Sequence, residues 1–413
     1  MDGFQIGAAF LVLVAVVGWL NVRFLRLPTA VAMMTAGLLG AAALLLLSRP
    51  DSSVPAAREL LDVLRGIDFS ETVLGYMLAF LLFAGAMHVD MAELRRRGLS
   101  VLTLSTLGVL ASTLIVGFSL WWAAGLLGLP LPLPWAFVFG ALISPTDPIA
   151  VLAAARQGKP SELLKAVLQG EALFNDGVGI VVFGAALTFA VGAETHGPLI
   201  TAGHALLEAG GGGAIGASLA LIAIRALRSI DDYAAEVIIT LALAAGAYAL
   251  AQALHFSGPI AGAVAGLLVG TPHAATAMSQ STQRYVRGFW ALVDEILNAL
   301  LFLFLGLELA VLGIDGRHAG LWLAAIVLVL ASRLLVVLPW GWGLRRRHAE
   351  AGLTRLLWWG GLRGAISLAL ALTLPQGPER DLVLSATFAV VAFSVLVQGL
   401  SFPALTRRLT DHS

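Results

Sequence analysis

The sequence predicts an all-helical membrane protein that crosses the bilayer many times. Of its 413 residues, 59% are hydrophobic and only 12% are charged, and the mean hydropathy is +0.91. A soluble protein of this size is about a quarter charged. The apolar residues are gathered into stretches of the ~20 residues that are needed to cross ~30 Å of hydrocarbon. A polytopic membrane protein is therefore the class that fits, and the formal net charge of zero gives no sign of a nucleic-acid partner.

Charged residues and Gly/Pro turns divide the apolar stretches into thirteen predicted spans. Their approximate limits are 4–20, 28–47, 70–88, 99–127, 133–155, 162–191, 205–227, 234–254, 258–272, 288–313, 319–343, 354–374 and 382–406. The segment 49–69 mixes charged and apolar residues, so we expect it to lie along an interface. We expect residues 1–413 to form one transmembrane domain without a separate soluble domain, and the first stretch to be a span and not a cleaved signal peptide.

The distribution of Lys and Arg predicts the orientation. With the N-terminus outside, eighteen of the 25 basic residues fall in inside loops and five in outside loops, while Arg333 and Arg363 lie within spans. This excess agrees with the positive-inside rule and predicts an N-out, C-in topology. If span seven joins two six-helix halves, the halves have opposite orientations, as in many secondary transporters. Spans 5 and 12 then correspond, and each has an unusual centre.

Span 5 contains Ser144-Pro145-Thr146-Asp147-Pro148 at its centre. Two prolines three residues apart remove two backbone donors and break the helix. Broken backbone at membrane depth is tolerated only against protein or a wet cavity, and transporters use such breaks to bind ions. We expect Asp147 to cap the second half of this helix, to lie in an ion site beside Thr146, or to do both.

Span 6 carries Glu171, Asn175 and Asp176 in the middle of an apolar helix. A charge at this depth costs ~2.5 kcal/mol or more, which makes a purely structural acid expensive. On a helix, Glu171 and Asn175 lie about 40° apart and share a face, whereas Asp176 is about 140° from Glu171. One acid can therefore pair with a fixed cation while the other faces the path of an ion.

Span 12 carries Arg363 between glycines, in Gly360-Gly361-Leu362-Arg363-Gly364. A buried guanidinium stays charged and needs a partner, so we expect Arg363 to form a structural ion pair with Glu171 or Asp147, unless it extends to the cytoplasmic surface.

Other polar residues have simpler interpretations. Glu308 and Arg333 are candidates for a second structural pair. Asp294 and Glu295 lie near the start of predicted span 10, where they fit a cytoplasmic funnel or a solvated end. His88 lies near the end of a span and is expected at the interface.

Taken together, these motifs resemble the monovalent cation/proton antiporters of the NhaP and NHE type. The matching stretches are Ser144-Pro145-Thr146-Asp147-Pro148, Glu171-Ala172-Leu173-Phe174-Asn175-Asp176-Gly177, Ser257-Gly258-Pro259, Leu303-Phe304-Leu305-Gly306-Leu307-Glu308 and Gly361-Leu362-Arg363-Gly364. They occur in the order found in that family and spread from about residue 80 to 375. The Thr-Asp-Pro and Asn-Asp signatures are specific in combination.

The resemblance implies a homodimer of thirteen-helix chains in a bacterial inner membrane, with broken helices crossing at spans 5 and 12 and a role in pH homeostasis. It implies that Asp176 binds Na+ or Li+ and H+ in turn, with Asn175 beside it, and that Glu171 and Thr146 help to hold the ion. It also implies that Arg363 anchors an acid, that exchange is electroneutral because Asn and not Asp precedes Asp176, and that no cofactor is needed. Ala172 replaces a frequent Ser, and Ala84 lies where many members have an acid.

A simple competition accounts for such an exchange. One carboxylate in a wet cavity holds Na+ or H+ but not both, and only its neutral, loaded form crosses the low-dielectric barrier cheaply. A K+/H+ antiporter is the nearest alternative, and a cation channel or uniporter is a further one, because the same acids can line a pore. An intramembrane enzyme is disfavoured, since the sequence has no H-E-x-x-H, G-x-G-D or G-x-S-G motif.

Overall fold

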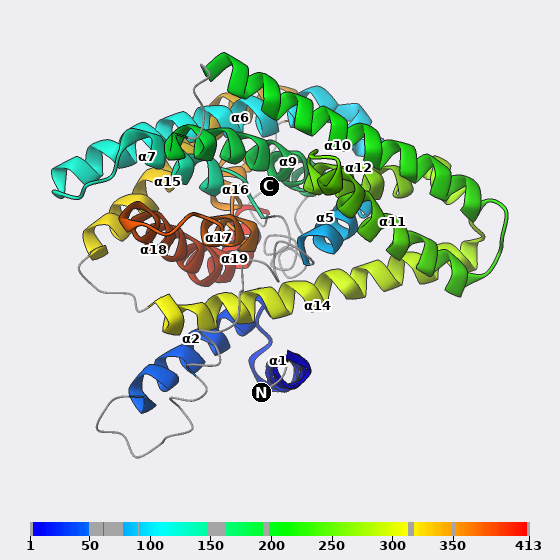
Figure 1. Cartoon of the computed structure of the whole chain (residues 1–413), viewed down its shortest axis with the longest axis horizontal. Coiled ribbons are helices and arrows are strands. Elements are labelled where there is room, and N and C mark those ends of the chain that lie inside the picture. The colour runs from blue at the N-terminus through cyan, green and yellow to red at the C-terminus, as the bar shows by residue number, and fades with distance from the viewer. Residues whose placement is uncertain are drawn as a thin grey trace.

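The structure is a computed structural model that describes residues 3–48, 61, 77–89, 91–147, 162–192, 198–312, 318–348 and 352–410. All elements formed by these residues are helices, which agrees with the predicted all-helical class (Figure 1). They are α1 (Gly3–Leu20), η1 (Asn21–Leu25), α2 (Thr29–Leu47), α5 (Leu78–Met87), α6 (Met91–Leu126), α7 (Leu133–Ile143), α9 (Glu162–Val191), α10 (Pro198–Leu227), α11 (Tyr233–Ala253), α12 (Gly258–Val269), α13 (Pro272–Ala275), α14 (Gln280–Leu312), α15 (Ala319–His348), α16 (Leu353–Trp359), α17 (Ala365–Leu372), α18 (Pro378–Phe393), η4 (Ser394–Gln398) and α19 (Gly399–Thr410).

The chain is a polytopic membrane protein. Nine helices of its described part are long and apolar enough to cross a membrane, and three shorter apolar helices are α5, α7 and α12. Predicted span 12 is divided between the short helices α16 and α17. The expected interfacial segment 49–69 and the second half of predicted span 5 lie almost wholly outside the described residues.

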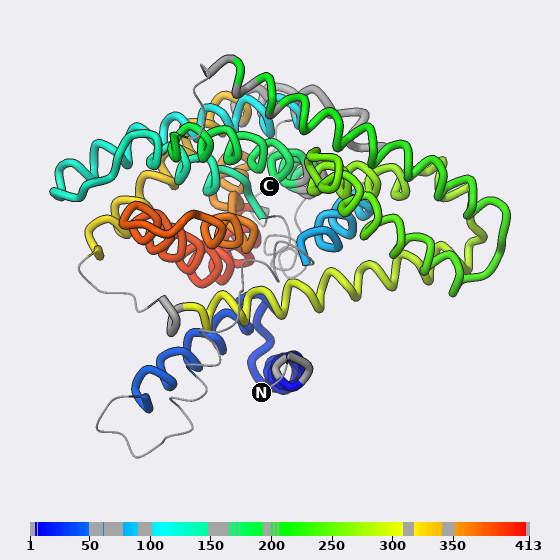
Figure 2. Tube along the Cα trace, in the orientation of Figure 1, coloured from blue at the N-terminus to red at the C-terminus, as the bar shows by residue number. Residues whose placement is uncertain are grey.

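Two groups of helices surround the centre of the molecule. In Figure 1, α10, α11 and α12 gather on one side, with α7, α15, α17 and α18 on the other, and the long helix α14 runs across both. The tube in Figure 2 follows the same path, with the blue N-terminal helices packed beneath α14. The first half of α14 joins the core formed with α5 and α10–α12 through Trp290, and its second half joins the core of the other group through Phe302.

Glycine allows a very close helix contact at the crossing of α2 with α14. A Cβ atom on Gly37 would lie 2.5 Å from the carbonyl oxygen of Leu303 and 2.8 Å from Cα of Gly306. A Cβ atom on Gly306 would lie 2.6 Å from the carbonyl oxygen of Met34. Small residues allow such close backbone approach within a membrane, where dispersion contacts replace the hydrophobic effect as the force between helices.

Substitution of Gly306 by Ala should destabilise the folded protein by about 1–3 kcal/mol, because the new methyl group meets backbone that cannot yield without separating the helices. Thermal unfolding in detergent micelles measures this. The control is Gly246→Ala in α11, where a Cβ atom would meet nothing within 4 Å. That control should stabilise the protein slightly, as Ala does in place of Gly inside a helix. Equal unfolding temperatures for the two variants would contradict the close crossing.

Candidate functional site

Two breaks in the helices meet near the centre of the molecule. The first, Ser144–Asp147, follows the end of α7, and the second, Gly360–Gly364, separates α16 from α17. They are joined by a backbone hydrogen bond in which the amide of Asp147 donates to the carbonyl oxygen of Leu362 at 2.8 Å. The backbone groups that each break leaves free are thus partly satisfied by the other break, as required for irregular backbone at membrane depth.

Arg363 completes this connection from the second break. Its guanidinium is buried and donates to the carbonyl oxygens of Ser144 and Pro145, the latter at 3.0 Å, while its backbone amide donates to Oγ of Ser394 at 2.7 Å. A positive charge therefore lies at the C-terminal end of α7, where the helix dipole and free carbonyl groups favour it. The expectation was an ion pair of Arg363 with Glu171 or Asp147. Glu171 is instead bound by Arg333, and the hydrogen bonds described for the Arg363 guanidinium are with backbone carbonyls.

Glu171 is the partner of Arg333 on α15. The guanidinium of Arg333 donates to both carboxylate oxygens of Glu171, Oε1 and Oε2, with a distance of 2.9 Å to Oε2. It also donates to the carbonyl oxygen of Leu357 at 3.1 Å. Both side chains are buried. The predicted pairing of Arg333 with Glu308 is therefore wrong, because the fold brings α15 against span 6.

Glu171, Arg333 and Arg363 line a small cavity of about 10 Å³, which has room for about one water molecule. Glu171 therefore lies among fixed cations and not beside Asp176, as expected from the different faces that the two acids occupy on α9.

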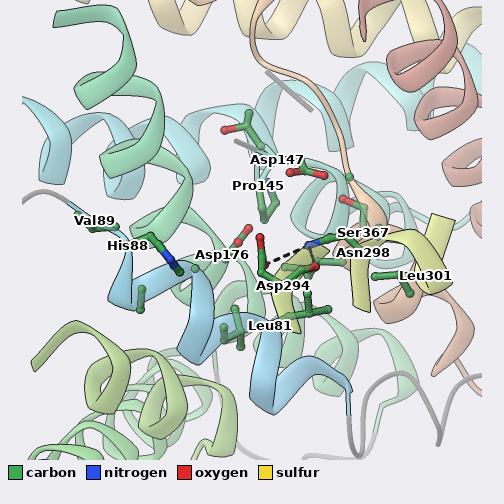
Figure 3. A pocket seen from close by; sticks show the side chains of 17 residues that line it. Leu81, His88, Val89, Pro145, Asp147, Asp176, Asp294, Asn298, Leu301 and Ser367 are labelled. Atoms are coloured by element: carbon green, nitrogen blue, oxygen red, sulfur yellow. Dashed lines mark hydrogen bonds between the residues drawn. The ribbon is translucent and has the colours of Figure 1, made fainter. Parts of the chain in front are cut away.

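Asp176 lines a larger cavity of about 140 Å³, enough for several water molecules (Figure 3). Residues from both breaks and from α5, α9, α14 and α17 surround this space, which we call the acidic cavity. Its polar lining consists of His88, Thr146, Asp147, Asp176, Asp294, Asn298 and Ser367. Figure 3 shows the carboxylates of Asp176 and Asp294 pointing toward one another within it. Two of the acids, Asp147 and Asp176, are predicted site residues that the fold has brought together.

Thr146 and Asn175 form a connection on the wall of the acidic cavity. Nδ2 of Asn175 donates to Oγ1 of Thr146 at 2.8 Å, and both side chains are buried. Among the described residues, Oδ1 of Asn175 has no hydrogen-bond partner. Thr146 thus accepts a hydrogen bond from Asn175, which leaves its hydroxyl proton and remaining lone pair for other partners.

Asp147 lies against the N-terminal end of α17. A Cβ atom on Gly364, the residue that precedes α17, would collide with the carboxylate of Asp147. Only glycine therefore lets this acid approach the end of α17, where the helix dipole favours negative charge. Asp147 and Thr146 both line the acidic cavity, whereas the second half of predicted span 5, which Asp147 was expected to cap, lies outside the described residues.

Asp294, Asn298, Ser367 and His88 line the acidic cavity but were not predicted site residues. Asp294 was expected near the start of its span, yet α14 begins at Gln280 and places this residue in its middle. Asp294 and Asn298 are four residues apart, so one helix face carries both. That spacing of polar residues in an apolar helix was a signal for the site. His88, expected at the interface, is an exposed part of the cavity lining at the end of α5.

Comparison with known proteins gives consistent results. The profile of the family described as "Sodium/hydrogen exchanger, transmembrane" matches residues 11–408. The chain is 44% identical to the Na(+)/H(+) antiporter NhaP of Pseudomonas aeruginosa, covering 97% of this chain and 96% of that protein. It is 33% identical to the Na(+)/H(+) antiporter NhaH of Halobacillus aidingensis over 94% and 93% of the two chains. The fold resembles the sodium proton antiporter MjNhaP1 of Methanocaldococcus jannaschii, with a TM-score of 0.75, 23% identity and 97% coverage of both chains.

Loss of one partner of the Glu171–Arg333 pair should destabilise the protein strongly. Glu171→Gln leaves the guanidinium buried without a counter-charge, which costs about 3–5 kcal/mol. Adding Arg333→Met removes that charge, so the double variant should unfold at a higher temperature than Glu171→Gln alone. The measurement is thermal unfolding in detergent of Glu171→Gln, Arg333→Met and the double variant. Additive losses would show that the two side chains do not stabilise one another.

Proposed function

Because the chain belongs to the sodium/hydrogen exchanger family, we propose that it exchanges Na+ for H+ with Asp176 carrying the two ions in turn. Na+/H+ antiport is the activity of this family, so the protein is a transporter and not an enzyme. The observation that carries the assignment to Asp176 is its position on the acidic cavity beside two broken helices. Half-helix ends and unwound backbone at such a crossing are typical of ion sites in secondary transporters.

We assign the ion ligands among the residues around Asp176. Its carboxylate supplies the exchangeable negative charge, and Thr146 and Asp147 supply further oxygen atoms from the same cavity. Asn175 holds the hydroxyl of Thr146 in place through its hydrogen bond. Oxygen atoms of this kind suit a hard cation such as Na+.

We do not assign Glu171 as a ligand of Na+. Both of its carboxylate oxygens accept from Arg333, and it lines the small cavity instead of the acidic one. We propose that Glu171 and Arg363 keep the two breaks in register, so that they act on the ion through the backbone that carries Thr146 and Asp147.

The exchange follows from electrostatics at Asp176. With Na+ or H+ bound, the carboxylate is neutralised and its helices can pass the low-dielectric barrier; the empty, charged form passes at a much higher cost. Access then alternates between the two sides of the membrane by movement of one helix group against the other. One monovalent cation replaces one proton in this scheme, which makes the exchange electroneutral. K+ remains the alternative substrate, because oxygen ligands alone do not select an ion radius sharply.

The wider assembly is part of the same proposal. We propose thirteen spans with the N-terminus outside and the C-terminus inside, two inverted six-helix halves, a homodimer, and residence in a bacterial inner membrane. The support is the excess of basic residues in the predicted inside loops and the bacterial relatives.

Asp176→Ala should abolish exchange, because it removes the carboxylate that is proposed to bind Na+ and H+ in turn. The assay is dequenching of a ΔpH-sensitive dye in everted vesicles from an antiporter-deficient strain, with Na+, Li+ and K+ added in turn. The control is Glu208→Gln, at an exposed acid of α10, which should behave as wild type. The order of the three ions decides between Na+ and K+. Undiminished exchange by Asp176→Ala would refute the assignment.

The apparent affinity for Na+ should fall as the pH drops. Protons and Na+ compete for one carboxylate, so in the acid range the half-saturating Na+ concentration should rise by up to about tenfold for each pH unit. At higher pH the carboxylate is free of protons and the apparent affinity should level off. Sodium titrations of the same vesicles between pH 6 and 9 measure this. A half-saturating concentration that is constant over the whole range would contradict a shared site.

A further inference from the structure

The acidic cavity contains a carboxylate that the proposed exchange does not use, that of Asp294. It lies in the middle of α14 and is partly buried, and Figure 3 shows it pointing across the cavity toward Asp176. The next residue, Glu295, is exposed and is not part of the cavity lining. Two neighbouring acids of the same helix therefore have different surroundings, and only Asp294 belongs to the cavity.

Asn298 holds Asp294 in this position. Its Nδ2 atom donates to Oδ1 of Asp294 at 3.1 Å and to the backbone oxygen of the same residue at 2.8 Å, and the first bond is drawn in Figure 3. Asn298 itself is buried. Because one carboxylate oxygen is fixed from the helix side, the side chain of Asp294 loses little further freedom when it binds a cation in the cavity.

The charges around Asp294 favour a cation between it and Asp176. Asp147 is the third acid in the lining, which also contains the imidazole of His88. The buried guanidinium groups of Arg333 and Arg363 instead bind Glu171 and backbone carbonyls. A confined space lined by several carboxylates, such as the acidic cavity, concentrates cations. A bound cation relieves the repulsion between the carboxylates.

Asp294 and Asp176 lie on helices whose main neighbours differ. Helix α9, which carries Asp176, packs mainly on α6 and α7, whereas α14 packs mainly on α2, α5 and α11. Alternating access in secondary transporters moves one bundle against another around the ion site. Such a movement changes the separation of the two carboxylates, so their present approach belongs to one conformation of the transport cycle.

We propose that Asp294 is a cation-binding residue that receives the cation in the acidic cavity and passes it to Asp176 on one side of the membrane only. This inference rests on the proposed function, because it takes Asp176 as the exchange site. The exposed residues of the cavity lining, Gly85 and His88, place the open side of the cavity at the C-terminal end of α5. In the predicted topology this is the cytoplasmic side.

The test compares the two faces of the membrane with the full-length protein. Uptake of radioactive Na+ is measured as a function of Na+ concentration in everted and in right-side-out vesicles. The external pH and the pH difference between the outside and the inside of the vesicle are the same in both preparations. Asp294→Asn should raise the half-saturating Na+ concentration by about tenfold at the cytoplasmic face, since one attracting carboxylate is lost. At the opposite face it should equal the wild-type value. Glu295→Gln is the matched control and should equal wild type at both faces.

Two further variants separate a cation-binding role of Asp294 from a structural one. Asp294→Glu keeps the charge and should restore most of the affinity at the cytoplasmic face. Asn298→Ser frees the carboxylate and should raise the half-saturating concentration at that face by a smaller factor. Half-saturation is independent of the amount of protein in the vesicles, so poor accumulation of one variant does not alter the comparison.

The outcomes distinguish this inference from the proposed function. If Asp176→Ala is inactive and Asp294→Asn equals wild type at both faces, or is changed equally at both, Asp294 has no one-sided role and the inference is wrong. If Asp176→Ala still exchanges Na+ for H+, the proposed function itself fails, whatever Asp294→Asn does. A change at the cytoplasmic face alone, restored by Asp294→Glu, supports both.

Discussion

The arrangement of the site depends on one constraint, that broken backbone inside a membrane must find its hydrogen-bond partners within the protein. Pro145 interrupts the first helix, and the glycine-rich segment around Arg363 interrupts the second. Each break supplies what the other lacks: the amide of Asp147 donates to the carbonyl oxygen of Leu362, and Arg363 donates to the carbonyl oxygens of Ser144 and Pro145. Because each break needs the other, the two are held together, and the side chains carried by the first break are placed at a defined wall of the acidic cavity.

Near the two breaks, the charged groups that stabilise the structure are separate from those that line the acidic cavity. Glu171 and Arg333 neutralise one another, and Arg363 is stabilised by the carbonyl end of α7. Desolvated charges are tolerated only with such partners. Asp176 lies on another face of α9 and lines the cavity, where water or a cation can reach it. The groups that must stay charged therefore have strong partners, and in the proposed mechanism the carboxylate of Asp176 stays able to exchange its ion.

The amino-acid sequence by itself determined the class of protein and marked most of its apolar helices, and it suggested several residues of the candidate site. Hydropathy and length mark the spans, since a chain in lipid has few ways to satisfy its backbone. The prolines and glycines mark the two breaks, and an acid in an apolar helix is expensive enough to indicate function, which is why the sequence suggested Asp147 and Asp176 as site residues. These conclusions depend on local chemistry, and local chemistry can be read along the chain.

Only the tertiary structure decided which distant side chains meet. The sequence suggested Glu308 for Arg333 and Glu171 or Asp147 for Arg363, but a buried cation accepts any carboxylate or carbonyl group that the fold brings near. The packing of α15 gives Glu171 to Arg333, and the crossing of the breaks gives backbone carbonyls to Arg363. The place of Asp294 likewise depended on where α14 begins and which of its faces meets the cavity. Such pairings depend on the angles and distances between helices, which the order of residues along one helix does not contain.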